Sequence, residues 1–364
     1  MILYIHIPFC DHKCGYCTFN SYTDKHHLKS LYIQSLLQDI KATLRWWKIY
    51  HNGQNLDSIY IGGGTPNILD SRAYARIFEC IYQFTSTPKE ITIESNPNLL
   101  QKQWCKDLIS FGINRISIGV QSFFDDTLVF LERKHTYKDI FKSIECARDF
   151  EHISIDLIYG TPFDSTQRLA EEIAYATSLP IDHLSAYSLT LEEGSSLHRR
   201  YHDIKPDMTK HNEYNEYGDS EYNNGEYVAT LLREAGFMQY EVSNYARGYK
   251  SLHNLSYWRG DEYLGCGAGG FGRIKNVRYC GTHNIERYIQ NPLYKHKEYL
   301  SIKDLDFERL FLGLRCEIGI STHNLNPKKV EILCSENKCM YLDHHSIRAK
   351  NFFLADEIAL WLSS

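Results

Sequence analysis

The sequence predicts an α/β fold, a partial (β/α)6 barrel of the TIM type followed by a small, mostly helical C-terminal module. Two observations predict it: short β-branched runs recur about every 30 residues, and apolar residues at helical spacing lie between them. The expected strands are Tyr4–Ile7, Ser58–Ile61, Ile91–Glu94, Arg115–Gly119, Ile153–Ile158 and His183–Ser188. The expected helices are Ser71–Gln83, Gln101–Phe111, Thr136–Phe150 and Gln167–Ser178. Strand–helix–strand repeats of this kind indicate parallel pairing.

The remaining chain divides by composition. We expect residues 1–200 to form the barrel, 201–300 an extension that completes its core, and 301–364 the C-terminal module. Residues 198–225 are polar and rich in Asn, Glu, Asp and Tyr, which predicts an exposed connection or a solvated helix. Strand character returns at Gln239–Val242.

Polar or glycine-rich residues follow successive strands. The segments are Gly62–Pro66, Glu94–Pro97, Gln121-Ser122, and Asp156 with Tyr159–Pro162. Parallel barrels build their sites at the carboxyl ends of strands. Any one segment alone is equally well explained as an ordinary turn, but four of them together favour a shared site.

Composition excludes several classes of protein. The net charge is −5 and no lysine- or arginine-rich run occurs, which argues against a nucleic-acid partner. Eleven cysteines, an odd number and mostly scattered, favour a reducing compartment over a disulfide framework. The first residues lack the basic segment and apolar core of a signal peptide, and no run approaches a membrane span of about 20 residues. We therefore expect a cytoplasmic protein.

Three cysteines, Cys10, Cys14 and Cys17, form a C-x3-C-x2-C motif directly after the first expected strand. Thiolates suit iron–sulfur clusters and zinc. Structural zinc needs four ligands, and His12 is the nearby candidate for the fourth. A four-iron cluster on three cysteines would instead leave one iron open. The pair Cys334 and Cys339 lies too far along the chain to be assigned a role.

The segment IHIPFCDHKCGYCTF resembles the cluster loop of the radical S-adenosylmethionine (SAM) superfamily. In that superfamily a [4Fe-4S] cluster binds SAM through its open iron and reduces it to a 5′-deoxyadenosyl radical. The GGGTP segment resembles the loop that approaches the amino-acid portion of SAM, where glycine allows close contact. The resemblance implies that Cys10, Cys14 and Cys17 ligate the cluster. It also implies SAM contacts from Tyr4, Tyr16, Gly63, Gly64, Thr65, Glu94, Gln121, Arg133 and Asp156.

The combination of YIHIPFC, GGGTP, IESNP, GVQSF and DLIYGTP is similar to the oxygen-independent coproporphyrinogen III oxidase family. Its decarboxylating enzymes carry a further cysteine two residues after the third, where this chain has Phe19. The HemW-type haem-chaperone subgroup has phenylalanine there and a later H-N-x-x-Y-W motif, which matches His253–Trp258. The resemblance therefore implies a haem chaperone. The alternative is oxidative decarboxylation of coproporphyrinogen III to protoporphyrinogen IX in porphyrin biosynthesis.

Histidine and tyrosine both ligate haem iron, so His253 is the preferred haem ligand and Tyr257 the alternative. From residue chemistry alone, a buried, hydrogen-bonded histidine in an aromatic core explains His253 better. The subgroup motif reverses that preference. The resemblance implies haem as cargo and haem-acceptor proteins as partners, membrane respiratory enzymes being one candidate class that would bring the chain to the inner membrane. It leaves the oligomeric state open.

Overall fold

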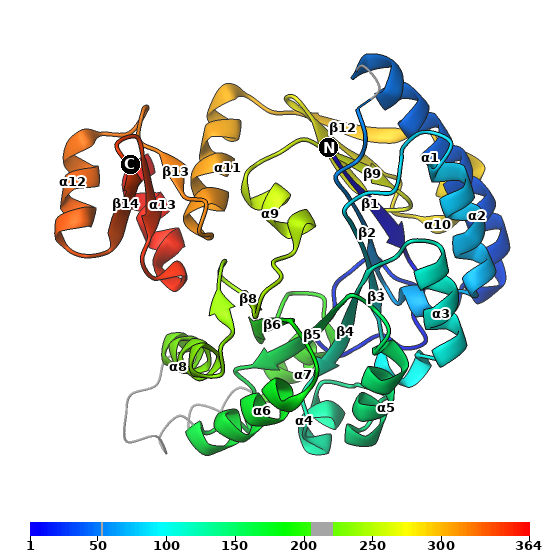
Figure 1. The fold of residues 1–364 in the computed structure, drawn as a ribbon, viewed down its shortest axis with the longest axis horizontal. Helices are drawn as coiled ribbons and strands as arrows, with labels where there is room; N and C mark the ends of the chain where they lie inside the picture. The colour runs from blue at the N-terminus through cyan, green and yellow to red at the C-terminus, as the bar shows by residue number, and fades with distance from the viewer. Residues whose placement is uncertain (52–53, 205–220) are drawn as a thin grey trace.

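The computed structural model describes residues 1–51, 54–204 and 221–364. Six parallel strands follow one another in chain order, with helices on their outer side (Figure 1). The strands are β1 (Ile2–Ile7), β2 (Ser58–Gly63), β3 (Glu90–Ser95), β4 (Arg115–Gln121), β5 (His152–Tyr159) and β6 (His183–Ser188). The helices are α1 (Lys29–Tyr50), α2 (Ser71–Ile81), α3 (Lys102–Ser110), α4 (Asp125–Phe130), α5 (Tyr137–Ala147), α6 (Thr166–Ser178) and α7 (Ser196–Ile204). The predicted α/β class and partial (β/α)6 barrel are confirmed.

The described part of the extension lengthens this sheet at both edges. Strands β9 (Tyr263–Cys266), β10 (Phe271–Ile274), β11 (Val277–Gly281) and β12 (Lys295–Tyr299) continue it from β1, and β8 (Asn244–Ala246) and β7 (Met238–Gln239) from β6. The helices here are α8 (Glu221–Glu234), α9 (Leu252–Trp258) and α10 (Ile285–Gln290). Figure 1 shows α9 on the open, concave side of the sheet. Residues 205–220 of the expected polar connection lie outside the described residues.

The single strand predicted at Gln239–Val242 is wrong in its bounds. The chain turns between β7 and β8, because the Glu241 carboxylate accepts a hydrogen bond from Ser243 N (3.0 Å) and closes a local turn. β-Propensity alone could not show that turn.

The C-terminal module has its own hydrophobic core. It contains α11 (Ile302–Leu314), β13 (Ile320–Ser321), α12 (Pro327–Ser335), β14 (Cys339–Asp343), β15 (Ser346–Ala349) and α13 (Ala355–Ser363). Its three strands form a separate sheet. Cys334 and Cys339 are free thiols. The module is mostly helical, as predicted, whereas the three predicted domain boundaries stay predictions. No helix among the described residues could cross a membrane.

Alternation along the strands separates an apolar layer from a polar interior. In β3, Ile91 and Ile93 pack in the core shared with the helices. Successive side chains of a strand point to opposite faces, so Glu90, Thr92 and Glu94 share the other face. The interior face of β3 is therefore polar along its length.

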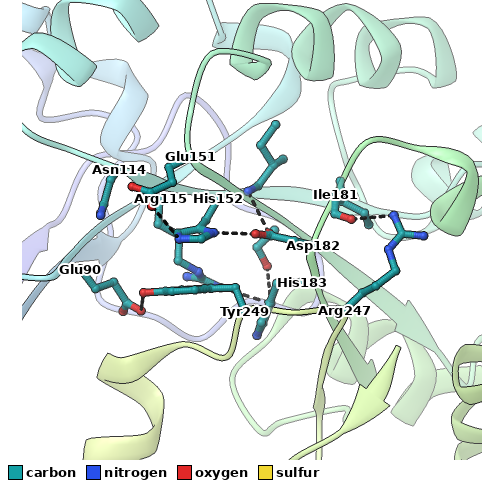
Figure 2. Close-up of polar contacts among 12 residues, drawn as sticks. Glu90, Asn114, Arg115, Glu151, His152, Ile181, Asp182, His183, Arg247 and Tyr249 are labelled. Atoms are coloured by element: carbon teal, nitrogen blue, oxygen red, sulfur yellow. Dashed lines mark hydrogen bonds and ion pairs between the residues drawn. The ribbon is translucent and has the colours of Figure 1, made fainter. Parts of the chain in front are cut away.

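A cluster of buried and half-buried polar side chains lies at the amino ends of the strands (Figure 2). We call Glu90, Arg115, His152, Asp182, His183 and Tyr249 the basal network. Four of these, Glu90, Arg115, His152 and His183, are the first residues of β3 to β6.

Hydrogen bonds and one ring contact join the members of the basal network. Arg115 Nη2 lies 3.1 Å from His183 Nδ1, and His152 Nδ1 lies 2.6 Å from Asp182 Oδ2. Tyr249 stacks on His152 and donates to Glu90 (2.9 Å). The pKa of His183 is well below its usual range because burial and the Arg115 charge disfavour a second cation.

Candidate functional site

A cavity of about 420 Å³ lies at the opposite, carboxyl ends of the strands. Eleven residues predicted for the site line it: Cys10, Cys14, Tyr16, Cys17, Gly63, Gly64, Thr65, Glu94, Gln121, Arg133 and Asp156. We call it the cysteine-loop cavity. The tertiary structure thus brings together segments that are spread over nearly 150 residues of sequence.

Residues 10–17, which carry Cys10, Cys14 and Cys17, form what we call the cysteine loop. Backbone and side-chain contacts hold it in place. Cys10 N donates to Tyr22 O (3.0 Å), and Gly15 N donates to Leu131 O (3.1 Å). Cys10 Sγ accepts from Thr65 Oγ1 (3.4 Å), and Cys14 Sγ accepts from Arg133 Nη1 (3.1 Å). All three cysteines line the cavity, although no three His, Cys, Asp or Glu groups among the described residues are close enough together to hold a single metal ion.

The segment Gly62–Pro66, which we call the glycine loop, packs directly against the cysteine loop. A Cβ on Gly64 would lie 2.5 Å from Phe9 O and 3.0 Å from Cys10 Sγ. Gly63 has φ +119°, and a Cβ there would lie 2.5 Å from the His6 ring. At these two positions other residues of the protein occupy the space that a side chain would need. The absence of a side chain therefore lets the two loops approach each other closely.

Two half-buried carboxyl groups, Glu94 and Asp156, face the cavity from β3 and β5. Glu94 accepts from Tyr60 OH (2.8 Å) and Gly63 N (3.0 Å), and Asp156 accepts from Ser117 Oγ (3.2 Å). Burial raises the pKa of Glu94 to about 7, with a further rise from the Asp156 charge, although both hydrogen bonds to Glu94 lower it. Burial also raises the pKa of Asp156. Such groups can accept hydrogen bonds from hydroxyl or ammonium donors of a ligand.

Arg133 supplies a half-buried cation beside the thiols. Its Nη2 donates to Asn96 Oδ1 (2.9 Å) and to Gly119 O (2.8 Å), whereas its Nε has no hydrogen-bond partner among the residues that the structure describes. Gln121 ends β4 with φ +65°, where the β4–β5 register shifts. A residue with a strained backbone at a β-bulge often turns its side chain toward a functional site, and Gln121 lines the cysteine-loop cavity. Three thiols beside a fixed cation fit an anionic iron–sulfur cluster.

A second cavity, of about 520 Å³, shares Thr18, Phe19, Gly63 and Glu94 with the first. We call it the aromatic cavity. Its other lining residues are Tyr4, His6, Asn20, Tyr60, His253, Asn254, Tyr257, Tyr263, Gly269, Phe271 and His283. Tyr4, predicted as a SAM contact, lies here and not in the first cavity. Phe19, with 66 % of its surface exposed, stands between the two.

The H-N-x-x-Y-W motif lies on α9, whose amino end is tied to the basal network. Glu90 accepts from Leu252 N (2.7 Å), His253 N (3.1 Å) and Ser251 Oγ (3.2 Å). The ring of His253 is 1 % exposed, with Nδ1 2.8 Å from Ser58 Oγ and Nε2 3.3 Å from Tyr257 OH. Both ring nitrogens therefore have partners within the protein, as expected for a buried, hydrogen-bonded histidine.

Sequence reasoning missed several residues of this site. Tyr263, Phe271 and His283 belong to no motif, His6 lies in the YIHIPFC segment without being assigned a role, and Phe19 was noted only as a subgroup marker. The tertiary structure brings them into the aromatic cavity. The one available signal was the alternation of β1, which puts Tyr4 and His6 on one face.

Comparisons with known proteins agree with this geometry. Residues 4–176 match the model of the Radical SAM superfamily. The chain is 35 % identical to "Heme chaperone HemW" of Bacillus subtilis, over 89 % of this chain and 86 % of that protein. It is 32 % identical to "Heme chaperone HemW" of Escherichia coli, over 84 % of this chain and 80 % of that protein.

A mammalian mitochondrial relative and a solved structure extend the comparison. "Radical S-adenosyl methionine domain-containing protein 1, mitochondrial" of Mus musculus is 32 % identical over 88 % of this chain and 74 % of its own length. The structure of coproporphyrinogen III oxidase (HemN) from Escherichia coli aligns with a TM-score of 0.78, covering 100 % of this chain and 89 % of that one at 19 % identity, which shows a shared fold. The chain belongs to the HemW family of radical SAM proteins.

Proposed function

We propose that this protein binds haem in the aromatic cavity and delivers it to haem-requiring proteins. Membership in the radical SAM superfamily implies a [4Fe-4S] cluster and SAM as cofactors. The observation that carries the proposal is the aromatic cavity, which has the size of a small-molecule site and shares a wall with the cysteine-loop cavity. Similarity to proteins called haem chaperones supports it.

In this proposal the chain's own residues have separate tasks. Cys10, Cys14 and Cys17 hold the cluster, and Arg133 offsets negative charge on the thiolates. Glu94 and Asp156 orient SAM through its hydrogen-bond donors. When bound, the cluster supplies an electron to SAM.

Haem would be held by flat apolar and aromatic faces and by a ligand from α9. Tyr257 is half-buried and its hydroxyl lies 3.3 Å from Nε2 of His253, so either residue can offer a ligand atom from this wall once their mutual hydrogen bond is broken. Histidine and tyrosine both serve as axial ligands of haem iron.

The experiment is anaerobic reconstitution of the full chain with iron and sulfide, followed by titration with haemin. We expect saturable haem uptake and transfer of that haem to an apo-haem protein. A His253→Ala variant should show a weaker haem absorption band, and an unchanged spectrum would remove His253 from the ligand role.

The same preparation tests the decarboxylase alternative. Reduced protein with SAM and coproporphyrinogen III should leave the porphyrinogen unchanged. Its consumption, together with formation of 5′-deoxyadenosine and methionine, would contradict the chaperone proposal.

A further inference from the structure

The aromatic cavity has three histidines in its wall, and two of them already use both ring nitrogens. His6 is 6 % exposed, and its ring nitrogens lie 2.9 Å from Tyr4 OH and 2.8 Å from Asn20 O. His253 is bonded on both sides in the same way. For either to ligate iron, a buried hydrogen bond has to break and its former partner would lose its contact, which costs free energy.

The third histidine, His283, lies between β11 and α10 and is exposed. Its Nε2 lies 3.4 Å from the sulfur of Cys280, a weak hydrogen-bond partner. Within the described residues its ring makes no hydrogen bond to an oxygen or nitrogen atom. The ring meets Phe271 edge to face, with 6.1 Å between the centroids. A lone pair on this imidazole is therefore available for a metal.

The backbone of His283 is fixed to the segment that follows the cysteine motif. Asn20 Nδ2 and Tyr22 OH each donate to His283 O (3.0 Å). Asn20 Nδ2 also lies 3.0 Å from Ala268 O. Gly269 has φ +83°, and a Cβ there would lie 2.8 Å from Asn20 Nδ2. The glycine-rich segment after β9 thus lets Asn20 reach His283.

From these contacts we propose that His283 is an axial ligand of haem iron. It lies between β11 and α10, on a different part of the cavity wall from the H-N-x-x-Y-W motif of α9. The inference rests on the proposed haem binding and adds a ligand to it. It further implies that the cysteine loop and the haem ligand share one rigid support, because Asn20 and Tyr22 hold both.

The test is a haemin titration of the reconstituted full chain, followed by absorption and electron paramagnetic resonance spectra. The variant is His283→Ala, and the matched control is His296→Ala, which removes another exposed histidine, on β12, outside the aromatic cavity. We expect His283→Ala to weaken haem binding by about tenfold or more, since even outer-shell partners of a metal are worth about 10–100-fold. The signature of histidine-ligated iron should be lost, and added imidazole should restore it. His296→Ala should match the wild type.

Each result decides the question. If the wild type binds haem and His283→Ala keeps its affinity and spectrum, the inference falls and the proposed function stands. If the spectrum is lost and imidazole does not restore it, His283 is structural and the inference also falls. If the wild type takes up no haem, both proposals fall. Circular dichroism and cluster iron content should be equal in all the variants, since His283 is exposed.

Discussion

The two ends of the barrel use the same residue types for opposite purposes. At the amino ends, the basal network pairs Arg115 with His183 and gives the Glu90 carboxylate four hydrogen-bond donors from the segment 249–253. At the carboxyl ends, the Glu94 carboxylate accepts from two donors among the described residues, Tyr60 OH and Gly63 N, and burial raises its pKa to about 7. A carboxylate with many donors, such as Glu90, is held in the fold by them, whereas one with fewer donors, such as Glu94, costs stability when ionised and remains available to a ligand.

The largest expected effect is the loss of iron from a variant of the cysteine loop, compared with a cysteine variant elsewhere in the barrel. We expect Cys14→Ser to abolish cluster assembly after anaerobic reconstitution, because thiolates hold the cluster and serine is a poor substitute. Cys146→Ser, which changes a half-buried cysteine on α5 outside the loop, should retain the wild-type iron and sulfide. Full iron in the Cys14→Ser protein would contradict the assignment of the loop.

Next in size is the effect of breaking the basal network. Arg115→Met should lower the free energy of unfolding by about 3–5 kcal/mol, because it leaves buried partners without their compensating charge. Arg148→Met removes an exposed partner of Glu145 and should cost about 1 kcal/mol or less. Urea denaturation of the cluster-free protein measures both. A loss below that of the surface control would show that the network does not depend on Arg115.

The corresponding change in the cysteine-loop cavity should reduce binding and leave stability intact. Glu94→Gln should weaken SAM binding by about tenfold or more, since a hydrogen bond to a charged group is worth about 1.5–3 kcal/mol. Its free energy of unfolding at about pH 8 should equal or exceed that of the wild type, because burial disfavours the ionised carboxyl group. Calorimetric titration with SAM and urea denaturation give the two values. A large loss of stability with unchanged SAM binding would assign Glu94 to the fold.

The smallest effect is a pH dependence of stability. The folded pKa of Glu94, about 7, lies above its ordinary value of 4.5. Between these values the folded state binds more protons than the unfolded state, so the Glu94 contribution to stability falls as pH rises and is constant above about pH 7. The difference in unfolding free energy between wild type and Glu94→Gln, measured from about pH 5 to about pH 8, should show this trend. A difference independent of pH would contradict the raised pKa.

Much of the barrel could be predicted because its signals are local. The strand at Ile91–Glu94 and the helix at Ser71–Gln83 each follow from periodicity, and both occur as β3 and α2. The helix begins one residue after Asp70, whose side chain accepts from Arg72 N (2.9 Å). The strand expected at Gln239–Val242 had the wrong bounds, because β-propensity does not show that the Glu241 side chain closes a turn there.

The cysteine loop and the glycine loop could be expected at one site from the sequence, because both follow strands and parallel strands end at one edge of the sheet. Tyr16 and Arg133 were expected there only from the resemblance to the radical SAM superfamily, and the aromatic cavity could be found only in the folded chain. His283 is 266 residues beyond Cys17 in the sequence, yet Asn20 and Tyr22 hydrogen-bond to its carbonyl oxygen. Such contacts depend on how β9 to β11 join the edge of the barrel at β1, and no local pattern of residues encodes that junction.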